Sequence, residues 1–381
     1  MEIKNLKKAA QRILKAIKNK EKIVLYGDAD LDGATSVIIL GDAIKSLGGK
    51  ISAVYFPDRE IEGYGITEKG LRFLKKEAPA LLVALDCGIG NFKEVKLAKT
   101  LGFEVMIIDH HLVLDKLPEA KIIVDPKQKD DQYSFKELCA AGLTFKLSEA
   151  VLGNRLTESL RKNFLELVAL ATIADMMPRE SENIIFIEEG LYFLKNSWRP
   201  GIKAFLEIDL FKNYPNLNQK ISKIISILNI RDIKDGWPAS FRLLSSSSLE
   251  EAKGIIKELL KKSEKRGEKI EEIIDEVEKR LKEKEDPIIF EGDADFDSIL
   301  ISSVASMICQ KYLKPVFLYK KMLKESHGTV RTPKETNGVS LMKKCSEYLL
   351  TYGGHPRAAG FRIKNENLEK FRNCLLKNFK P

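Results

Sequence analysis

Acidic residues and histidines recur at four places along this 381-residue chain, and each place follows a short apolar run. The four segments are Asp28-Ala29-Asp30-Leu31-Asp32-Gly33, Asp86-Cys87-Gly88, Asp109-His110-His111 and Ala174-Asp175-Met176-Met177. Carboxylates gathered beside buried strands repel one another and lose their hydration, and a cation between them offsets that cost. Oxygen ligands with one or two histidines suit Mn²⁺ or Mg²⁺ better than a structural zinc, which prefers thiolates. Together, the four segments predict a divalent-metal site able to attack a phosphoester.

The first segment has alternating carboxylates, and an extended backbone would point Asp28, Asp30 and Asp32 to one side. Gly33 would then let the chain turn into a helix at Ala34, whose first amides help to hold an anion. Taken alone, such a segment is equally typical of a solvated acidic turn. The companions elsewhere in the chain favour the metal site.

The second segment offers a single carboxylate at its strand end. We expect Asp86 to be the ligand that two cations share, because one carboxylate can bridge two metal ions. Cys87 should turn away from Asp86 and pack in the core, since successive side chains of a strand alternate.

Apolar runs that alternate with helical spacing predict the elements that bring these residues together. The runs fall at 22–27, 51–56, 81–86, 104–109 and 121–124, and helical spacing appears between the first four, as in 34–47 and 91–101. This rhythm predicts a doubly wound parallel α/β sheet, in which ligands bind beyond the carboxyl ends of the strands. Three of the four acidic segments fall at such ends, so we expect them to meet at one edge.

The remainder of the chain divides into helical segments and a second α/β unit. Residues 134–200 are mainly helical in pattern, with Asp175 directly after the apolar helix 164–173, whereas 201–246 allow no detailed assignment. Residues 248–285 predict a long amphipathic helix. We favour a connector between domains over a coiled-coil arm, because the apolar spacing is not a clean heptad and Gly267 interrupts it. We therefore expect a catalytic domain over 1–246, a connecting helix over 247–286 and a smaller α/β domain over 287–381.

The smaller domain has its own predicted elements. Apolar runs indicate strands at 287–291, 315–319 and 328–330, and helices are expected around 299–312, 339–350 and after residue 366. Gly292-Asp293-Ala294-Asp295-Phe296-Asp297-Ser298 nearly copies the first acidic segment. We favour a solvated turn capped by Asp297 or Ser298 over a second metal site, because no Asp-His-His segment lies near it in the sequence.

Composition sets the class of protein. An apolar content of 44% is that of a globular chain, and we expect no membrane span and no signal peptide. The five cysteines are scattered, which indicates reduced core residues and a cytoplasmic location. A formal net charge of +9 fits an anionic partner such as nucleic acid.

The order of the motifs resembles the DHH phosphoesterases of the RecJ type, with a DHHA1 second domain. The residues that carry the resemblance are the four acidic segments, Pro57-Asp58-Arg59, Glu62-Gly63-Tyr64-Gly65, Leu138-Cys139-Ala140-Ala141-Gly142 and Gly353-Gly354-His355-Pro356-Arg357-Ala358-Ala359-Gly360. The resemblance spans residues 22–360 and implies a two-manganese nuclease, with Mg²⁺ as the alternative ion. It implies the metal ligands Asp28, Asp30, Asp32, Asp86, His110 and Asp175.

The same resemblance assigns further residues. Asp109 would orient its neighbour, and His111 would face metal or phosphate, which completes a catalytic set of eight residues with the six ligands. Substrate would be bound by the 353–360 loop through Gly353, Gly354, His355 and Arg357, and by Arg331, which stands where the family has a phosphate-contacting arginine. Tyr64, Tyr352 and Trp237 are aromatic residues for which packing is favoured over stacking on bases.

The sequence also departs from bacterial RecJ proteins. They carry Asn-Ala-Ala-Gly-Arg where this chain has Asn229-Ile230-Arg231-Asp232-Ile233. We expect no OB-type domain after Gly360, and on that basis the chain resembles short archaeal RecJ-like nucleases more.

We therefore expect a Mn²⁺-dependent exonuclease of DNA replication and repair that degrades single-stranded DNA to mononucleotides. RNA is a second expected substrate, 5′→3′ digestion is favoured over 3′→5′, and a replisome or helicase protein is an expected partner. One alternative is an oligoribonuclease or small-nucleotide phosphodiesterase, which a length series of substrates separates from the exonuclease. The other alternative is a replisome scaffold with a RecJ-like fold, against which the complete ligand set argues.

Overall fold

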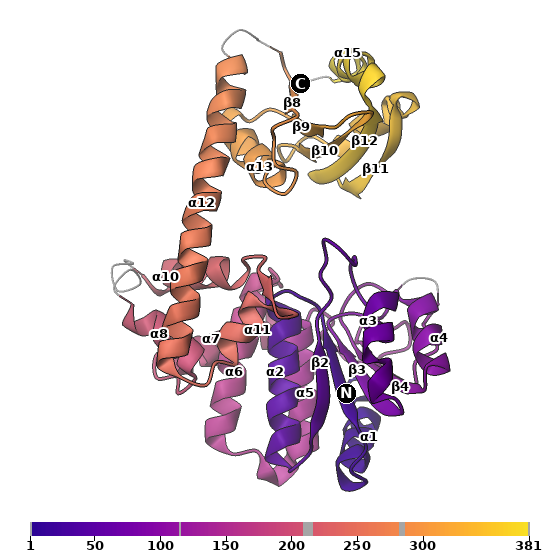
Figure 1. The fold of residues 1–381 in the computed structure, drawn as a ribbon, viewed down its shortest axis with the longest axis vertical. Coiled ribbons are helices and arrows are strands. Elements are labelled where there is room, and N and C mark those ends of the chain that lie inside the picture. Colours follow the sequence, from indigo (N-terminus) through magenta and orange to yellow (C-terminus); the bar gives the residue numbers. More distant parts are fainter. Residues whose placement is uncertain (1, 114–115, 209–215, 282–285, 380–381) are drawn as a thin grey trace. The chain divides into compact units, whose positions relative to one another are not determined.

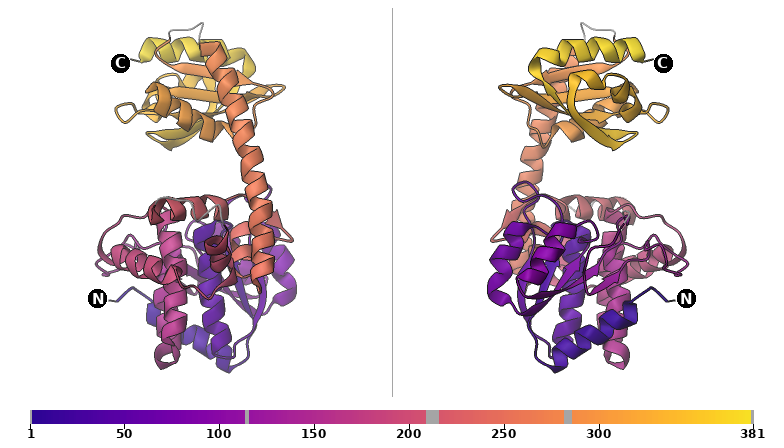
Figure 2. Two further views of the ribbon diagram at one scale, coloured as in Figure 1. Left: turned by 90° about the vertical axis from the view of Figure 1, so that its left-hand side faces the viewer. Right: turned by 90° about the vertical axis from the view of Figure 1, so that its right-hand side faces the viewer.

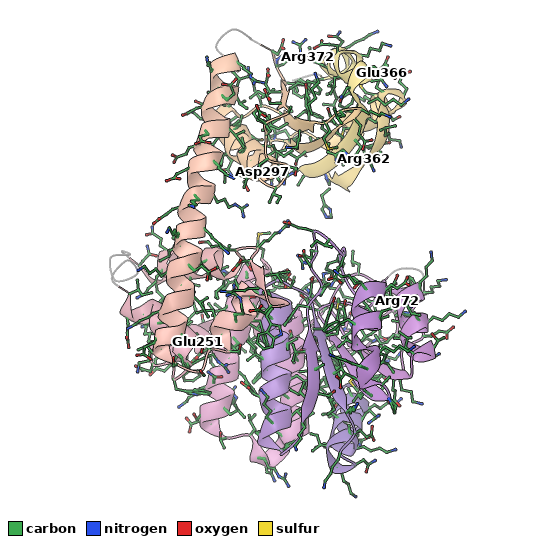
Figure 3. The ribbon with its side chains drawn as sticks, viewed as in Figure 1. Arg72, Glu251, Asp297, Arg362, Glu366 and Arg372 are labelled. Carbon is green, nitrogen blue, oxygen red and sulfur yellow. A yellow bond between two sulfur atoms is a disulfide. The ribbon has the colours of Figure 1, made fainter. Side chains whose placement is uncertain are left out.

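A computed structural model describes residues 2–113, 116–208, 216–281 and 286–379. The chain forms two compact units, Met1–Leu260 and Lys261–Pro381. In Figure 1 the colours follow the sequence, from indigo at the N-terminus to yellow at the C-terminus. Charged side chains such as Arg72 in the first unit and Arg362 in the second extend from the surface of their own unit (Figure 3).

A parallel sheet forms the centre of the first unit. Its strands in the described residues are ordered β2-β1-β3-β4-β5 and comprise β1 (Ile23–Gly27), β2 (Ile51–Tyr55), β3 (Ala80–Leu85), β4 (Phe103–Ile108) and β5 (Ile122–Val124). Every residue of β1 and β3 is buried, which explains why these strands are continuous apolar runs. The doubly wound parallel sheet predicted from the sequence is therefore confirmed.

The register of this sheet aligns the strand ends. Gly27 of β1 pairs with Leu85 of β3, Leu85 pairs with Ile108 of β4, and Ile108 pairs with Val124 of β5. The residue that follows each of these four positions is an aspartate. Four carboxylates therefore begin from neighbouring points on one edge of the sheet.

Helices cover both faces of this sheet (Figures 1 and 2). Alternate strand residues point to opposite faces, so Leu25 and Val83 belong to one core cluster and Val24 and Leu82 to the other. The first core includes residues of α1 (Leu6–Lys18), α2 (Leu31–Ser46) and α5 (Ala140–Leu152). The second core includes residues of α3 (Glu68–Leu74) and α4 (Phe92–Thr100).

The rest of the first unit is mainly helical, as the sequence predicts for residues 134–200. Helix α6 (Glu158–Ala174) packs against α7 (Ser181–Leu194). Residues 201–246, for which the sequence gives no assignment, contain α8 (Pro200–Glu207), α10 (Leu217–Leu228), the hairpin of β6 (Ile233–Lys234) and β7 (Trp237–Pro238), and α11 (Ala239–Leu244). Short 3₁₀ turns occupy Lys75–Glu77 and Gly153–Arg155.

Helix α12 (Leu249–Leu281) runs from the first unit into the second without a break. The long helix predicted from the sequence is confirmed over the described residues 249–281, and Gly267 lies within it. A helical glycine costs only about 1 kcal/mol relative to alanine, and this one lies among strong helix formers such as Lys265, Arg266 and Glu268. The first half of α12 contributes Ile256 and Leu259 to the first unit's core, and its last turns contribute Ile273 and Val277 to a core of the second unit.

The second unit is a mixed sheet with helices. Its strands in the described residues are ordered β11-β12-β10-β9-β8, namely β8 (Ile289–Asp293), β9 (Val316–Lys321), β10 (Glu325–Arg331), β11 (Leu349–His355) and β12 (Ala358–Lys364). Only β8 and β9 pair in parallel among these described strands. The helices are α13 (Ile301–Tyr312), α14 (Gly338–Lys344) and α15 (Leu368–Asn378), and 3₁₀ turns occupy Ser346–Tyr348 and Asn365–Asn367.

Two expectations for the second unit are wrong in detail. The helix expected over 339–350 ends at Lys344, and residues 349–355 form strand β11. The expected loop over 353–360 is therefore most of a β-hairpin, in which Gly353 pairs with Gly360 and His355 with Ala358. Thr351 and Tyr352 favour strands and the two following glycines disfavour helices, so local preference agrees with the hairpin.

The sequence suggested that all five cysteines are reduced core residues, and this expectation is wrong for two of them. Cys87, Cys139 and Cys309 are free and buried, but Cys345 and Cys374 form a disulfide. Cys345 directly follows α14 and Cys374 lies in α15, so the fold brings together two residues that are 29 positions apart. Of the helices in the described part of the chain, none has both the length and the apolar character needed to cross a membrane.

Candidate metal centre

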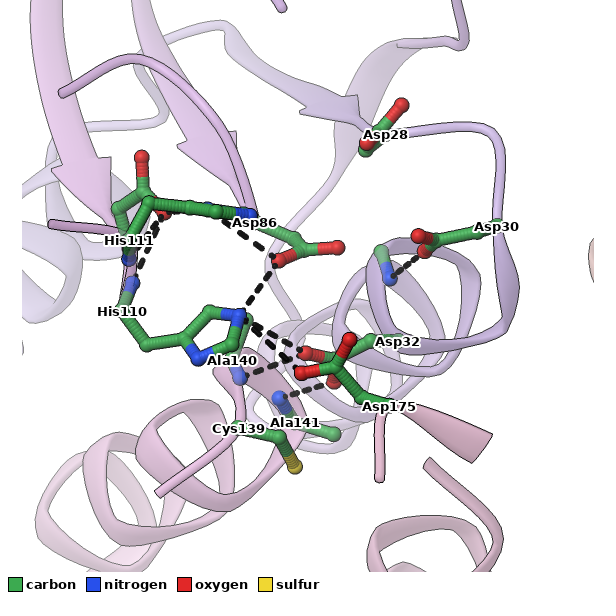
Figure 4. A network of polar contacts seen from close by, with 12 residues as sticks. Asp28, Asp30, Asp32, Asp86, His110, His111, Cys139, Ala140, Ala141 and Asp175 are labelled. Atoms are coloured by element: carbon green, nitrogen blue, oxygen red, sulfur yellow. Dashed lines mark hydrogen bonds and ion pairs between the residues drawn. The ribbon is translucent and has the colours of Figure 1, made fainter. Parts of the chain in front are cut away.

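The predicted ligands gather at the carboxyl edge of the first unit's sheet (Figure 4). Asp28 follows β1, Asp86 follows β3, and Asp109 and His110 follow β4. Each of these four side chains is buried, with at most 4% of its residue surface exposed. Four buried polar residues at one edge are costly unless they are paired or bind a ligand.

The sequence suggested an extended first acidic segment. This expectation is wrong, because helix α2 begins at Leu31. Asp30 is the N-cap of α2, and its Oδ1 accepts a hydrogen bond of 3.0 Å from the Gly33 backbone N–H. Asp32 therefore lies in the first helical turn. Gly33 was expected to let the chain turn, but in the structure it allows a close approach of two backbone segments. A Cβ at Gly33 would lie 2.4 Å from the carbonyl oxygen of Asp28, so only glycine fits there.

Asp32 is fixed by the beginning of another helix. The backbone N–H groups of Ala140 and Ala141, in the first turn of α5, each donate to a different carboxylate oxygen of Asp32 at 2.8 Å. These N–H groups have no partner inside their own helix, and the N-terminus of a helix favours a negative charge. The Leu138–Gly142 segment therefore holds a predicted metal ligand in place.

His110 lies at the centre of the cluster. Its Nε2 is 3.3 Å from Oδ1 of Asp86, 3.5 Å from Oδ2 of Asp175 and 3.7 Å from Oδ2 of Asp32. Asp175 is the C-cap of α6, so an element remote in sequence completes the set. Within the described residues, both ring nitrogens of His110 and Oδ1 of Asp86 are buried without a hydrogen-bond partner. Donor atoms in this arrangement suit a cation.

Three groups of ligand atoms in the described part of the chain are close enough to hold a metal ion. They are Asp86 with His110 and His111, Asp32 with His110 and Asp175, and Asp28 with Asp30 and Asp86, and within each group the ligand atoms lie within 4.8 Å of one another. Asp86 and His110 each belong to two groups. The six residues predicted as ligands are all included, and His111 joins them.

The electrostatics of the carboxylates also fit a divalent cation. Burial, and then the charges of Asp175 and Asp30, raise the pKa of Asp32 to about 8. Burial and the neighbouring carboxylates raise the pKa of Asp86 well above its usual range, and burial raises that of Asp175 to about 6. Burial also lowers the pKa of His110 to about 4, which favours the neutral imidazole that binds metals. A cation would favour the ionised carboxylates and relieve their repulsion.

Asp109 belongs to none of the three ligand groups of the described residues, and it holds the two histidines. Its Oδ1 accepts from the backbone N–H of His110 at 2.8 Å and lies 2.7 Å from Nδ1 of His111, while its Oδ2 accepts from the Ile89 N–H at 3.0 Å. Burial alone would raise the pKa of Asp109, but the hydrogen bond and charge of His111 lower it. This geometry suits a residue that orients His111, whose side chain is 43% exposed.

Three further residues at this edge were not predicted as site residues. Arg59 forms ion pairs with Asp28 and, at 2.9 Å, with Asp30. The Tyr64 hydroxyl donates to the carbonyl oxygen of Asp86 at 3.2 Å and lies 3.2 Å from each ring nitrogen of His111, so Tyr64 does more than pack. Asp125 is buried after β5, and its Oδ2 has no hydrogen-bond partner in the described residues. Asp125 could have been predicted from the sequence, because it directly follows the apolar run 121–124.

A cavity of about 320 Å³ opens beside the cluster. Asp30, Asp32 and Asp175 line one part of it, and Arg59 and residues 228–233 line another. The segment that departs from the bacterial motif, Asn229-Ile230-Arg231-Asp232-Ile233, therefore borders the predicted metal ligands. Arg231 is exposed there, whereas Asp232 forms an ion pair with Arg242.

The predicted substrate-binding residues belong to the second unit. Arg331 ends β10, Gly353, Gly354 and His355 end β11, and Arg357 lies in the turn before β12. The backbone N–H of Thr332 donates to the carbonyl of Arg357 at 3.2 Å, so the two arginines lie on adjacent segments. Tyr352 is 36% exposed, and Trp237 of the first unit packs edge-on against Phe241.

The second acidic segment forms a turn, as favoured from the sequence. Asp297 accepts from the Ile299 N–H at 2.8 Å, and Asp293 forms an ion pair of 2.5 Å with Arg280. None of its aspartates belongs to a group of potential ligands in the described residues.

Two family models match the chain, one within each unit. The DHH family N-terminal domain matches residues 22–172, and the DHHA1 domain matches residues 285–380. The fold and the site therefore define a protein of the DHH/DHHA1 class. Within that class the chain is a RecJ-like protein, as its motifs indicated.

Curated relatives carry the name single-stranded-DNA-specific exonuclease RecJ. The protein of Bacillus subtilis is 32% identical, and the match covers 98% of this chain and 48% of the relative. The protein of Thermus thermophilus is 29% identical, and the match covers 97% of this chain and 54% of the relative. The chain thus spans about half the length of these two relatives. The Escherichia coli protein is 26% identical over 97% of this chain and 68% of its own length.

Solved structures agree with the fold. A crystal structure of exonuclease RecJ bound to manganese has a TM-score of 0.80 and 27% identity, covering 100% of this chain and 96% of its own. The fold of CDC45 from Entamoeba histolytica is also similar, with a TM-score of 0.52 and 12% identity over 98% of both chains.

Proposed function

We propose that this protein is a divalent-metal-dependent exonuclease that hydrolyses the phosphodiester bonds of single-stranded DNA. One observation carries the proposal: Nε2 of His110 lies within 3.7 Å of three carboxylates and, within the described residues, forms no hydrogen bond. Buried groups of this kind need a cation, and divalent cations bound by carboxylates and imidazole are used to cleave phosphoesters. The names of the curated relatives support the choice of single-stranded DNA as the substrate.

We propose two Mn²⁺ ions at this edge, with Mg²⁺ as the alternative ion. The proposed ligands are Asp28, Asp30, Asp32, Asp86, His110 and Asp175. Asp86 and His110 each belong to two ligand groups, and we propose Asp86 as the shared ligand because a carboxylate has two oxygen atoms that can bind two ions. When bound, such ions lower the pKa of a water and neutralise charge on the phosphoryl group. The manganese in the similar RecJ crystal structure supports this choice of ion.

The chain's own residues have separate proposed roles. Asp109 fixes the tautomer and direction of His111, whose exposed ring donates to a phosphate oxygen of the strand. The ion pairs of Arg59 with Asp28 and Asp30 place a guanidinium beside the proposed ligands. The hydroxyl of Tyr64 holds the backbone of Asp86.

In the second unit, we propose that Arg331, Gly353, Gly354, His355 and Arg357 bind the backbone phosphates of the strand. The side chains of His355 and Arg357 are exposed, and the net charge of +9 favours a polyanion. We keep as proposals the division into 1–246, 247–286 and 287–381, digestion from 5′ to 3′ to mononucleotides, and RNA as a second substrate. The same holds for a role in DNA replication and repair, a replisome or helicase partner, and a cytoplasmic location.

Digestion of single strands labelled at either end tests the proposal. Purified protein with Mn²⁺ should shorten strands of all lengths above dinucleotides from one end and leave blunt duplexes intact, and Asp86→Ala should not. The labelled end that is lost first gives the polarity. Activity confined to the shortest oligonucleotides would favour a small-nucleotide phosphodiesterase, and absence of activity would favour a scaffold.

A further inference from the structure

Arg331 of the second unit is held through all three nitrogens of its guanidinium, and one N–H of Nη2 has no partner in the described residues. Its Nε donates to Oγ of Ser306 at 3.0 Å, and its Nη2 donates to Oγ of Ser302. Its Nη1 donates to Oγ1 of Thr329 at 3.0 Å and to the carbonyl oxygen of Val330 at 2.8 Å. The side chain is therefore fixed by four oxygen atoms that are all uncharged.

The two serines are built to receive this arginine. Ser302 and Ser306 lie one turn apart on α13, so their side chains share one face of the helix. The Ser306 hydroxyl donates its own proton to the carbonyl oxygen of Ser302 at 3.0 Å. Its lone pairs therefore remain free to accept from Arg331, and the direction of the hydroxyl is set before any ligand binds.

The charge of Arg331 is not neutralised by these contacts. Among the described residues, no carboxylate forms an ion pair with Arg331. Three other arginines of the second unit do form such pairs: Arg280 pairs with Asp293 at 2.5 Å, Arg362 with Glu325 at 2.6 Å and Arg372 with Asp286 at 2.5 Å. Burial lowers the pKa of Arg331, as expected for a cation surrounded only by neutral groups. A fixed cation without a counter-charge is suited to an anionic ligand.

We propose that Ser302 and Ser306 are positioning residues that fix the guanidinium of Arg331 for a backbone phosphate of the single strand. This inference rests on the proposed function and adds two residues to it. A free arginine side chain loses many rotamers when it binds, and holding it in advance removes that cost from binding. The serines act through Arg331 and need not touch the strand.

The test measures affinity and kinetics in the full-length protein. Each variant is made in the Asp86→Ala background, so that a fluorescent single-stranded oligonucleotide is bound but not cut, and again with Asp86 intact for kinetics. Ser302→Ala with Ser306→Ala should raise both Kd and KM about tenfold and change kcat by less than about twofold, as expected for lost ground-state binding. Ser306→Thr keeps the hydroxyl and should restore most of the affinity.

A double-mutant cycle separates positioning from a general structural effect. In the Arg331→Ala background, the two serine substitutions should have no further effect on Kd, because the group that they position is gone. Ser303→Ala is the matched control, since Ser303 lies on the same helix but accepts from Arg266, at 3.4 Å. Its Kd and KM should equal those of the parent, and circular dichroism should show unchanged melting for every variant.

The outcomes also separate this inference from the proposed function. If the parent protein cuts single strands while the serine double variant keeps its Kd and KM, only the positioning role is overturned. The same follows if the serine substitutions weaken binding equally with and without Arg331. If the parent neither cuts nor binds single strands, the proposed function fails, and the inference fails with it.

Discussion

Nε2 of His110 lies 3.3 Å from Oδ1 of Asp86, yet neither atom forms a hydrogen bond with any described residue. Both residues are almost fully buried, so neither atom can turn to bulk water. A buried acceptor and a buried imidazole that face each other without bonding are costly, unless a third partner binds both. A divalent cation is the partner that fits both, and the predictions below follow from that relationship.

Substitution of the shared ligand should abolish hydrolysis. Asp86→Ala removes a side chain that belongs to two potential ligand groups, and we expect the rate to fall below about one per cent, a larger loss than substitution of an outer partner gives. The fold should persist, because the substitution also removes a buried carboxylate whose pKa is raised by burial and repulsion. Initial rates on a labelled single strand, with circular dichroism, measure both effects.

The control for this substitution lies in the near-copy of the first acidic segment. Asp295→Ala changes an exposed residue of that segment and should leave the rate unchanged. A rate for Asp86→Ala above a few per cent of the parent would count against the two-metal assignment.

The hydroxyl of Tyr64 should matter for the rate more than for binding. Asp86 has φ of 63°, a conformation that non-glycine residues rarely adopt, and Tyr64 donates to the carbonyl of that same residue. Tyr64→Phe removes one hydrogen bond, worth about 1 kcal/mol, and should lower kcat roughly fivefold with little change in KM. Tyr352→Phe, which also keeps its ring, is the control and should behave as the parent. A rise in KM alone would instead show that the Tyr64 hydroxyl acts in substrate binding and not through Asp86.

Glu166 should make stability depend on pH. This residue is buried in α6, and burial raises its pKa to about 7 despite hydrogen bonds from Ser197 and Asn163. The folded protein therefore binds this proton more tightly than the unfolded chain does, so the stabilisation is full below pH 4.5 and is lost as the pH rises to about 7. The unfolding free energy should fall across this window by at most about 3 kcal/mol on account of Glu166.

Urea unfolding of the parent and of Glu166→Gln at several pH values measures this contribution. The glutamine cannot ionise, so the variant should gain stability relative to the parent as the pH rises from 4.5 to 7. Glu188→Gln on the exposed face of α7 serves as the control. A constant difference between the parent and Glu166→Gln would show that Glu166 does not titrate in this window.

Gly33 should be essential for packing at the site. A Cβ at this position would lie 2.4 Å from the oxygen and 2.7 Å from the nitrogen of the Asp28 backbone. Gly33→Ala should therefore lower the unfolding free energy by about 1–3 kcal/mol, as overpacking does, and displace a proposed ligand. Gly267→Ala is the matched control, because nothing lies within 4 Å of a Cβ there, and it should stabilise α12 by up to about 1 kcal/mol. Equal stability of the two variants would contradict the close approach.

Much of the site was predictable because its geometry is set by the sheet. Apolar runs locate the strands, parallel strands align their carboxyl ends, and the register places Asp28, Asp86 and Asp109 directly after paired residues. The same logic applies to Asp125 after β5, which the sequence analysis did not use. Asp175 was included because it follows an apolar helix, but the sheet does not determine its position, which depends on how α6 packs.

Other features depend on tertiary contacts that a local pattern does not contain. Alternation suggested an extended Asp28–Asp32 segment, but capping by Asp30 begins a helix at Leu31. The disulfide between Cys345 and Cys374 requires α14 and α15 to meet, and the spacing of the cysteines gives no sign of that. Likewise, the hydroxyl contact of Tyr64 with Asp86 joins residues 22 positions apart, with α3 and β3 between them in the sequence.

The most direct test is to locate manganese in crystals of the protein by anomalous diffraction. We predict two manganese peaks at the carboxyl edge of the first unit's sheet, with Asp86 between them and His110 bound to one. Crystals of Asp86→Asn should lose at least one of the peaks. Peaks absent from this edge, or two peaks with full occupancy that do not contact Asp86, would contradict the account.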